Sequence, residues 1–454
     1  MNEIVTTRSR TDTFDQQRVL DLAQLALVEA RKLGATAAEA GVAESRGLSV
    51  AVRQGEIDTL EHHRDGNVAI TVYKNKSKGS ASTTDLSPAA VKAMAAAACS
   101  IAGFTAADEY SGLADPAQLA TTIPDLDLYH PWPISAEQAI ELARTCEAAA
   151  FAVDKRISNS EGAMVTTSEG IAAYANTHGF AGSYMGTRHM LSCAVIAAQG
   201  DEMQSDYWYT RSRMSGGLEP AESIGRRAAE CALKRLGARR IRTRQAPVLY
   251  AAEIAGSLLG NFLNAIQGSV LYRGASFLLD QKGKQIFPAD ISLQEQPHIL
   301  AGMASAPYDD EGVATRTHDI VRDGVLLDYM LDSYSARKLG MTTTGNAGGV
   351  RNLVVQSPEM KLDLSGLIEK MHTGLLVTRL MGHGINIVTG DYSRGAGGFW
   401  VENGEIQYPV DEITIAGNLQ DMLRNIAAVG RDLDRRGSIL TGSILVESMT
   451  IAGE

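Results

Sequence analysis

Residues 158–211 read SNSEGAMVTTSEGIAAYANTHGFAGSYMGTRHMLSCAVIAAQGDEMQSDYWYTR. Short runs of strand-forming residues follow one another here, separated by turns that contain glycine, and this pattern is typical of consecutive β-strands. Helical spacing of apolar residues predicts one helix over 136–153, capped by Ser135, and another over 220–236. The stretch therefore predicts a strand-rich sheet with flanking helices in the first half of the chain.

Residues 1–110 also alternate between helical and extended patterns. Gly34 fits the position just after a first helix, and Ser87 with Pro88 is a typical start for a second one. We expect helices over 15–33 and 88–102, strands over 40–44 and 48–54, and a hairpin over 66–83.

The segment GARRIRTRQAP (237–247) is basic and ends in proline, and we place a domain boundary inside it. Turns such as VRDGVL (321–326) and VENGEI (401–406) follow, and DG or NG between apolar residues is a strong hairpin signal. The predicted fold class is α+β with two domains. An N-terminal α/β domain with a strand-rich sheet and flanking helices covers 1–240, and a β-rich C-terminal domain covers 241–454.

Composition excludes several classes of protein. The chain has 454 residues, 44% hydrophobic and 21% charged, with a formal net charge of −11. This length favours two domains, and the acidic balance argues against direct nucleic-acid binding, which needs a basic face. The polar N-terminus lacks a signal-peptide core, and no apolar run is long enough for a membrane span. The four cysteines show no CxxC spacing, so we expect reduced thiols in a cytoplasmic protein.

Residues 248–268, VLYAAEIAGSLLGNFLNAIQG, join a short apolar run to a longer pattern of helical period. Glu253 is the one charged residue in this stretch. A carboxylate amid so much apolar surface must be solvated, paired or used, so Glu253 is a candidate for a functional role.

Familiar catalytic motifs are absent from the sequence. It contains no HExxH or HExxxH pair of histidines and no GxSxG nucleophile turn. The glycine-rich segments GNAGG (345–349) and GHGINIVTG (382–390) lack the lysine of a phosphate-binding loop. The nine histidines are scattered, and His62 and His63 would point to opposite faces of one strand. The residue patterns alone therefore predict no metal site.

Two further stretches are candidates for a functional role. PYDDEGVAT (307–315) places three carboxylates before a glycine, and a solvated turn or a backbone-capping site is the alternative interpretation. GDYSRGAGGFWVENGE (390–405) combines small residues with an aromatic pair, which would let a peptide backbone dock along a strand edge. A glycine-rich hairpin with a structural tryptophan is the alternative for the second stretch.

Longer motifs carry a resemblance to a known family. These are GDYSRGAGGFWVENGEIQYPVDEITIAGNLQDMLRNI (390–426), PYDDEGVATR (307–316), TGNAGGVRN (344–352) and GSILTGSILVESMTIAG (437–453). They resemble the PmbA branch, also called TldE, of the TldD/PmbA family, and the similarity covers essentially the whole chain.

The resemblance implies a cytosolic subunit that works with a TldD-type partner as a zinc-dependent protease complex. Such complexes act on unfolded peptides, in the maturation of peptide-antibiotic precursors such as microcins and in antitoxin degradation, and the family was also named as a modulator of DNA gyrase. A homodimer is plausible when the partner is absent. As candidates for a peptide cleft we take Asp309, Asp310, Glu311, Asn346, Asp391, Arg394, Phe399 and Trp400.

In the resembling family, the TldD-type subunit carries HExxxH on a helix, and a cysteine near the C-terminus completes its zinc site. At the matching positions this chain has Ala252, Glu253 and Ser257, and no cysteine follows Cys231. The resemblance therefore implies no catalytic residue, metal or cofactor in this chain, with zinc held by the partner. Glu253 would then serve the subunit interface, or it is a solvated glutamate without a role.

Two other functions stay open. One is an autonomous peptidase that recruits a metal ion through His318 or His383 with Asp309 or Glu311. The other is a regulatory protein that contacts gyrase or another client without proteolysis. The metal content of the purified chain would separate the autonomous peptidase from the leading hypothesis. Peptide cleavage that appears only after mixing with a TldD-type protein would separate the leading hypothesis from the regulator.

Overall fold

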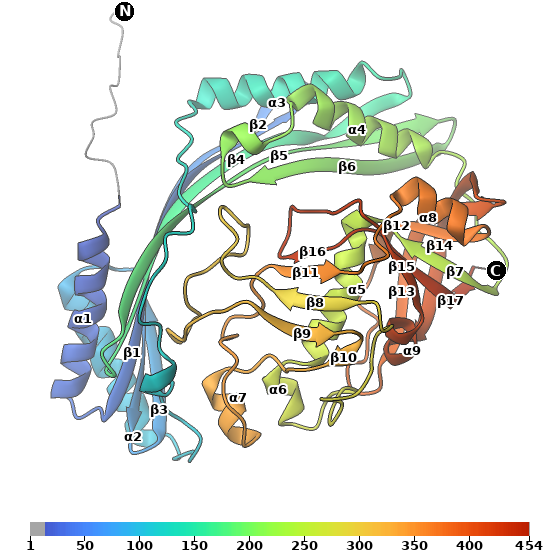
Figure 1. Ribbon diagram of the computed structural model, residues 1–454. Helices are drawn as coiled ribbons and strands as arrows, with labels where there is room; N and C mark the ends of the chain where they lie inside the picture. Colours follow the sequence, from blue (N-terminus) through green and yellow to red (C-terminus); the bar gives the residue numbers. More distant parts are fainter. Residues whose placement is uncertain (1–13, 454) are drawn as a thin grey trace, which may run out of the picture.

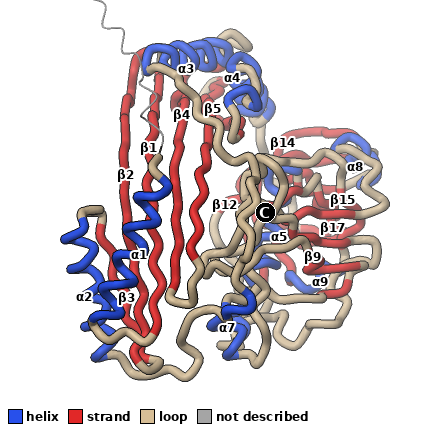
Figure 2. The backbone as a smooth tube through the Cα atoms, turned by 60° about the vertical axis from the view of Figure 1, so that its left-hand side comes forward, coloured by secondary structure: helices blue, strands red, loops and turns tan. Residues whose placement is uncertain are grey.

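The computed structural model describes residues 14–453, so the polar segment 1–13 lies outside the described residues (Figure 1). The first half of the chain forms a six-stranded antiparallel sheet in the order β3-β2-β1-β4-β5-β6. Its strands are β1 (Ala37–Arg53), β2 (Glu56–Lys74), β3 (Ser77–Thr83), β4 (Ile157–Asn176), β5 (Ala181–Gln199) and β6 (Glu202–Ser212). β1, β2, β4 and β5 are 17 to 20 residues long, against about five or six for an average strand. We call this the long sheet, and it arches over the second half of the chain (Figures 1 and 2).

β1 runs without interruption where the sequence pattern predicted two separate strands, over 40–44 and 48–54, so that prediction is wrong. At the expected break, Gly47 pairs with His63 of β2 on one side and with Ser168 of β4 on the other. A Cβ atom on Gly47 would collide with the His63 ring and with the backbone oxygen of Thr167. The glycine therefore permits a close approach of neighbouring strands and does not mark a turn.

Four helices cover the convex face of the long sheet (Figure 1). They are α1 (Gln16–Lys32), α2 (Pro88–Phe104), α3 (Ala136–Phe151) and α4 (Ala221–Lys234), close to their predicted ranges. Ser87 and Ser135 cap α2 and α3 as the sequence predicts, because their side chains accept hydrogen bonds from the backbone N–H groups of Ala90 and Gln138. The concave face of the long sheet is directed toward the second half of the chain.

The second half of the chain builds two further sheets. One has the order β14-β13-β12-β7-β17-β15 and consists of β7 (Arg244–Tyr250), β12 (Gly374–Met381), β13 (Asp391–Glu402), β14 (Glu405–Asn418), β15 (Ile426–Val429) and β17 (Ile444–Ala452). The other has the order β10-β9-β8-β11-β16 and consists of β8 (Ser292–Glu295), β9 (His318–Arg322), β10 (Val325–Leu326), β11 (Leu353–Gln356) and β16 (Ile439–Leu440). The predicted DG and NG turns join β9 to β10 and β13 to β14.

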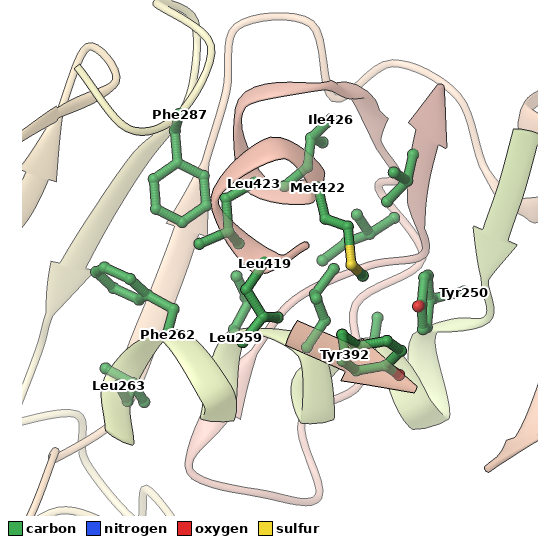
Figure 3. Close-up of a cluster of buried hydrophobic side chains, with 14 of the residues drawn as sticks. Tyr250, Leu259, Phe262, Leu263, Phe287, Tyr392, Leu419, Met422, Leu423 and Ile426 are labelled. Carbon is green, nitrogen blue, oxygen red and sulfur yellow. The ribbon is translucent and has the colours of Figure 1, made fainter. Parts of the chain in front are cut away.

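The helix α5 (Ala252–Ala265) shares one hydrophobic core with both of these sheets. Its side chains Leu259 and Phe262 point toward Phe287 and toward Leu419 and Leu423 (Figure 3). The remaining helices are α6 (Gly268–Leu271), α7 (Ser333–Lys338), α8 (Leu364–Met371) and α9 (Leu419–Arg424). Phe262 is fully buried, so packing in the core fixes the position of α5. The first turn of this helix is thereby also fixed.

Helices and extensive sheets in more than one domain confirm the predicted α+β class. The division into 1–240 and 241–454 stays a prediction; α4 ends at Lys234 and β7 begins at Arg244. Across residues 14–453, no helix combines the length and the apolar character needed to cross a membrane.

Gly225 of α4 provides a test of this packing. A Cβ atom there would collide with the backbone oxygen of Cys146 in α3, and backbone cannot move aside cheaply. We expect Gly225→Ala to lower the free energy of unfolding by about 1–3 kcal/mol, measured by urea denaturation. The matched control is Gly103→Ala in α2, where nothing lies within 4 Å, and it should leave stability unchanged or raise it by about 0.5–1 kcal/mol. Equal effects of the two variants would contradict the close packing of α4 on α3.

Candidate functional site

The first turn of α5 borders a cavity of about 460 Å³ between the long sheet and the second half of the chain, which we call the α5 cavity. The first half of the chain contributes Glu161, Ala194, Ser205, Asp206, Tyr207 and Arg235. The second half contributes Glu253, Ile254, Ser257, Thr378, Arg379, Leu380 and Arg394. Of the residues singled out from the sequence, Glu253, Ser257 and Arg394 therefore lie together.

The way α5 begins leaves one edge of β12 open to this cavity. β7 pairs in parallel with β12 only through Val248–Tyr250, and the Ala251 N–H then donates to the Val377 carbonyl (3.0 Å). The chain turns into α5 at that point, while β12 continues to Met381 and pairs only with β13. Within residues 14–453, no strand pairs with the other edge of β12 beyond Val377. This free edge lies next to Thr378, Arg379 and Leu380, which line the α5 cavity.

The side chains at the start of α5 do not fit a zinc ion. Ala252 offers no donor atom, and Ser257 offers only a hydroxyl, whose oxygen is buried without a hydrogen-bond partner. Glu253 is exposed at the cavity. No group of three or more His, Cys, Asp or Glu side chains in the described chain is arranged to hold a metal ion.

Opposite charges balance in the α5 cavity. Three carboxylates (Glu161, Asp206, Glu253) and three guanidinium groups (Arg235, Arg379, Arg394) line it, so its side chains carry no net formal charge. In the described part of the chain, only Asp206 and Arg235 of these six form an ion pair, with Nε and Oδ2 at 2.5 Å. The Arg394 Nε is buried without a hydrogen-bond partner. Some hydrogen-bond donors and acceptors of the cavity thus have no partner within the described chain. A peptide backbone, which is polar and uncharged, can pair with such groups.

The carboxylates of the stretch 307–315 lie outside the α5 cavity, and each makes different contacts. Asp309 is 1% exposed, and its carboxylate accepts the backbone N–H groups of Glu311 and Val313 (both 2.9 Å) and of Ala347 (3.0 Å). Burial raises the pKa of Asp309 to about 6, although these three N–H groups oppose that shift. Asp310 is exposed and pairs with Arg351 (3.2 Å). Asp309 therefore organises the loop itself.

Glu311 lies where this loop approaches the long sheet. Its carboxylate accepts the backbone N–H of Ser333 (2.9 Å). Burial raises the pKa of Glu311 to about 7, and the neighbouring Asp309 and Asp332 add to the rise. A buried carboxyl with this pKa changes its charge near neutral pH.

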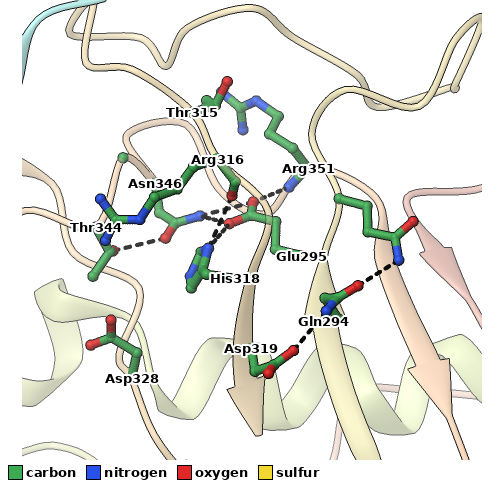
Figure 4. Close-up of polar contacts among 12 residues, drawn as sticks. Gln294, Glu295, Thr315, Arg316, His318, Asp319, Asp328, Thr344, Asn346 and Arg351 are labelled. Carbon is green, nitrogen blue, oxygen red and sulfur yellow. Dashed lines mark hydrogen bonds and ion pairs between the residues drawn. The ribbon is translucent and has the colours of Figure 1, made fainter.

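Asn346 belongs to a buried polar network around Glu295 (Figure 4). Its side-chain amide donates to both carboxylate oxygens of Glu295 (3.0 and 2.9 Å), and the backbone N–H of Arg351 donates to the same carboxylate. His318 Nδ1 lies 3.5 Å from Glu295, whereas His383 is exposed. Asn346 thus supports the loop near Asp309 and does not line the α5 cavity.

The predicted residues of β13 lie at different places along the strand. Asp391 is exposed and accepts a hydrogen bond from the Thr389 hydroxyl (2.6 Å). Phe399 is partly buried against the core, and Trp400 is 2% exposed and donates its Nε1–H to Glu402 (2.8 Å). Arg394 alone of this group reaches the α5 cavity.

Sequence reasoning missed Arg379 and the Asp206–Arg235 pair. One sequence feature could have pointed to Arg379, namely its charge close to the end of the apolar run GLLV (374–377). Such a charge is common at strand ends and is therefore weak evidence for a site. Asp206 and Arg235 become neighbours of Glu253 only because the long sheet folds over α5.

Comparisons with known proteins agree along the chain. Three family models match it in succession, described as PmbA/TldA metallopeptidase domain 1 (residues 38–102), central domain (129–236) and C-terminal domain (243–453). Metalloprotease PmbA of Escherichia coli is 47% identical over 439 residues, which make up 97% of this chain and 97% of that protein.

Solved structures give the same picture. A protein from Bacteroides thetaiotaomicron, described as a proposed modulator of DNA gyrase, has a TM-score of 0.90 at 29% identity, covering 96% of this chain and 98% of that one. TldE from Thermococcus kodakarensis has a TM-score of 0.79 at 22% identity, covering 95% of this chain and 100% of that one, which is a likeness of fold.

The raised pKa of Glu311 predicts a pH-dependent stability. Because the folded state holds this proton up to about pH 7, against an ordinary pKa of 4.5, charging of Glu311 lowers stability as the pH rises through that window. Glu311→Gln removes the charge and keeps an oxygen that accepts the Ser333 N–H. We expect the variant to be more stable than the wild type by about 1–3 kcal/mol at pH 8, with this difference shrinking toward pH 5, in denaturant titrations.

The control for this titration is Glu405→Gln, at an exposed glutamate in β14. It should show no comparable dependence on pH. A difference between Glu311→Gln and the wild type that stays constant from pH 5 to pH 8 would rule out the buried charge as its cause.

Proposed function

The chain belongs to the PmbA/TldD metallopeptidase family, and we propose that it is the metal-free, non-catalytic subunit of a two-subunit peptidase whose TldD-type partner holds the zinc ion. One observation carries the proposal, namely the residue types at the start of α5. Ala252 and Ser257 stand where the catalytic branch of the family carries imidazoles, and the sequence has no cysteine after Cys231. A catalytic zinc ion usually needs three protein ligands, and Glu253 alone cannot replace them.

The contribution of this subunit would be to bind an unfolded peptide and to shape the space in which it is held. An extended peptide has unpaired N–H and C=O groups, and the free edge of β12 beyond Val377 presents the complementary groups. Arg379 and Arg394 would donate to peptide carbonyls or carboxylates beside that edge, and Ser257 adds a hydroxyl with no internal partner. The balanced charge of the α5 cavity supports a substrate without a fixed net charge.

The substrates we propose are unfolded peptides, including peptide-antibiotic precursors and antitoxins, handled in the cytoplasm. A TldD-type subunit is the proposed partner, and a homodimer would form in its absence. Glu253, exposed at the cavity, would contact the partner or the peptide.

A second candidate function is regulation of DNA gyrase. The description of the Bacteroides thetaiotaomicron relative favours it, at 29% identity over nearly the whole chain. The two functions predict different results, because a regulator would alter supercoiling by gyrase without cleavage of a peptide.

Mixing experiments test the proposed function. We expect no cleavage of an unfolded peptide by this chain alone, and cleavage after addition of a TldD-type subunit, abolished by a chelator. Metal analysis should find less than stoichiometric zinc in this chain purified alone. Stoichiometric zinc with cleavage by this chain alone would establish an autonomous peptidase instead, and changed gyrase activity without cleavage in any mixture would favour the regulator.

Arg379 tests the role of the α5 cavity within the mixed complex. We expect Arg379→Gln to raise the KM for peptide about tenfold, because one charge-assisted donor is lost, while kcat changes less. The matched control is Arg226→Gln, at an exposed arginine of α4 outside the cavity, which should behave as the wild type. An unchanged KM in Arg379→Gln would place the peptide elsewhere.

A further inference from the structure

A second cavity, of about 530 Å³, lies between the concave face of the long sheet and the loops of the second half of the chain. It shares no lining residue with the α5 cavity, and the motif TGNAGGVRN (344–352) contributes Gly348, Val350 and Arg351 to its lining. We call it the concave cavity. Its volume lies within the range of small-molecule sites, which is about 300–1,000 Å³.

The floor of the concave cavity is made of small residues. Ser45 of β1 pairs with Gly170 of β4, which pairs with Gly186 of β5, so the three lie side by side across the sheet. Side chains two residues apart along a strand share a face, which adds Tyr184 and Arg188 to the face that carries Gly186. A broad floor without bulky side chains leaves room above it for a ligand.

Two arginines stand next to each other at one side of this floor. The paired register of β5 and β6 ends at His189 and Ser212, and Arg188 and Arg213 are the next residues on the two segments. Both arginines line the concave cavity, and they lie close enough for their charges to repel each other.

The charge of Arg213 is buried without a counter-ion. This residue is 7% exposed, and its guanidinium donates only to the backbone carbonyls of Gly302 (2.9 Å), Thr187 (3.2 Å) and Met303 (3.1 Å). Within residues 14–453, no carboxylate forms an ion pair with Arg213 or with Arg188. A buried charge that lacks a partner is costly, and a bound anion would relieve that cost.

The carboxylates near the concave cavity are already engaged. Glu44 also borders it, but its side chain pairs with Arg18 of α1 on the helix-covered face. Asp310 pairs with Arg351 at the rim of the cavity (3.2 Å). Neither carboxylate neutralises the Arg188–Arg213 pair, so this part of an otherwise acidic chain is locally basic.

We propose that the concave cavity is a binding site for an oxyanion, a carboxylate or phosphate group of a small ligand, held between Arg188 and Arg213 and contacted by the Tyr184 hydroxyl. Guanidinium groups bind such planar or tetrahedral oxyanions with paired N–H donors. Three N–H groups of Arg213 are used by the backbone carbonyls, which leaves two of its five free for a ligand. Arg213 is thereby fixed in place by the loop at 302–303, whereas Arg188 is exposed and can close onto the ligand.

The titration behaviour of the neighbouring groups agrees with this arrangement. Burial lowers the pKa of Arg213 to about 10, and the charge of Arg188 contributes to the lowering. Burial raises the pKa of the Tyr184 hydroxyl, so it stays protonated at neutral pH and can donate a hydrogen bond.

Calorimetric titration of the full-length chain tests this site, and it does not depend on the proposed peptidase function. The probes are inorganic phosphate, N-acetyl-trialanine with its free carboxylate, and the same peptide as its C-terminal amide. We expect one of the anionic probes or both to bind and the amide not to bind. Phosphate alone would identify a phosphate-bearing ligand as the source, and binding of the carboxylate peptide a peptide or organic acid.

Variants assign the binding to the two arginines. Arg188→Gln should weaken the anionic probe about tenfold, and Tyr184→Phe should weaken it less. Arg226→Gln, at the exposed arginine of α4, should bind as the wild type and excludes a general effect of net charge. No binding of either anionic probe, or equal binding by Arg188→Gln and the wild type, would overturn the proposal. Arg188 is exposed, and within residues 14–453 its side chain forms no hydrogen bond or ion pair, so we expect Arg188→Gln to leave the fold intact.

Discussion

Side-chain alternation along strands of 17 to 20 residues is the constraint on which the rest of this structure depends. Alternate side chains of β1, β4, β5 and the segment 68–72 of β2 face the helices α1 to α4, where alanine and valine predominate and permit close packing. The intervening side chains face the second half of the chain. The four helices cover only the convex face of this long sheet. Its concave face therefore remains to line the cavities.

The two cavities differ in charge because they take side chains from different elements. At the α5 cavity, three carboxylates of the long sheet and of α5 balance three arginines, Arg235 after α4, Arg379 of β12 and Arg394 of β13, so the lining side chains carry no net formal charge. At the concave cavity, the nearby carboxylates are engaged by Arg18 and Arg351, and within residues 14–453 no carboxylate pairs with Arg188 or Arg213. One polypeptide thus offers a neutral space suited to a peptide chain and a basic space suited to an anion.

Local features of the fold followed from short stretches of sequence. The serine caps of α2 and α3 and the DG and NG hairpins depend on contacts within a few residues, and each lies where its pattern predicts it. The break expected in β1 did not occur, because Gly47 makes room for His63 of a neighbouring strand. The acidic residue Asp309 binds backbone N–H groups as far away in sequence as Ala347, a partner that no local pattern reveals.

By itself, the sequence determined that the start of α5 offers no imidazole at two positions, because Ala252 and Ser257 cannot supply imidazole nitrogens in any conformation. It also determined family membership, which rests on residue identity along the chain. Only the tertiary structure decided that Glu253 shares a cavity with Arg379 and Arg394, and that Arg188 shares another with Arg213. These groups lie on separate elements, and their proximity arises from the register of strands and from the arch of the long sheet over α5.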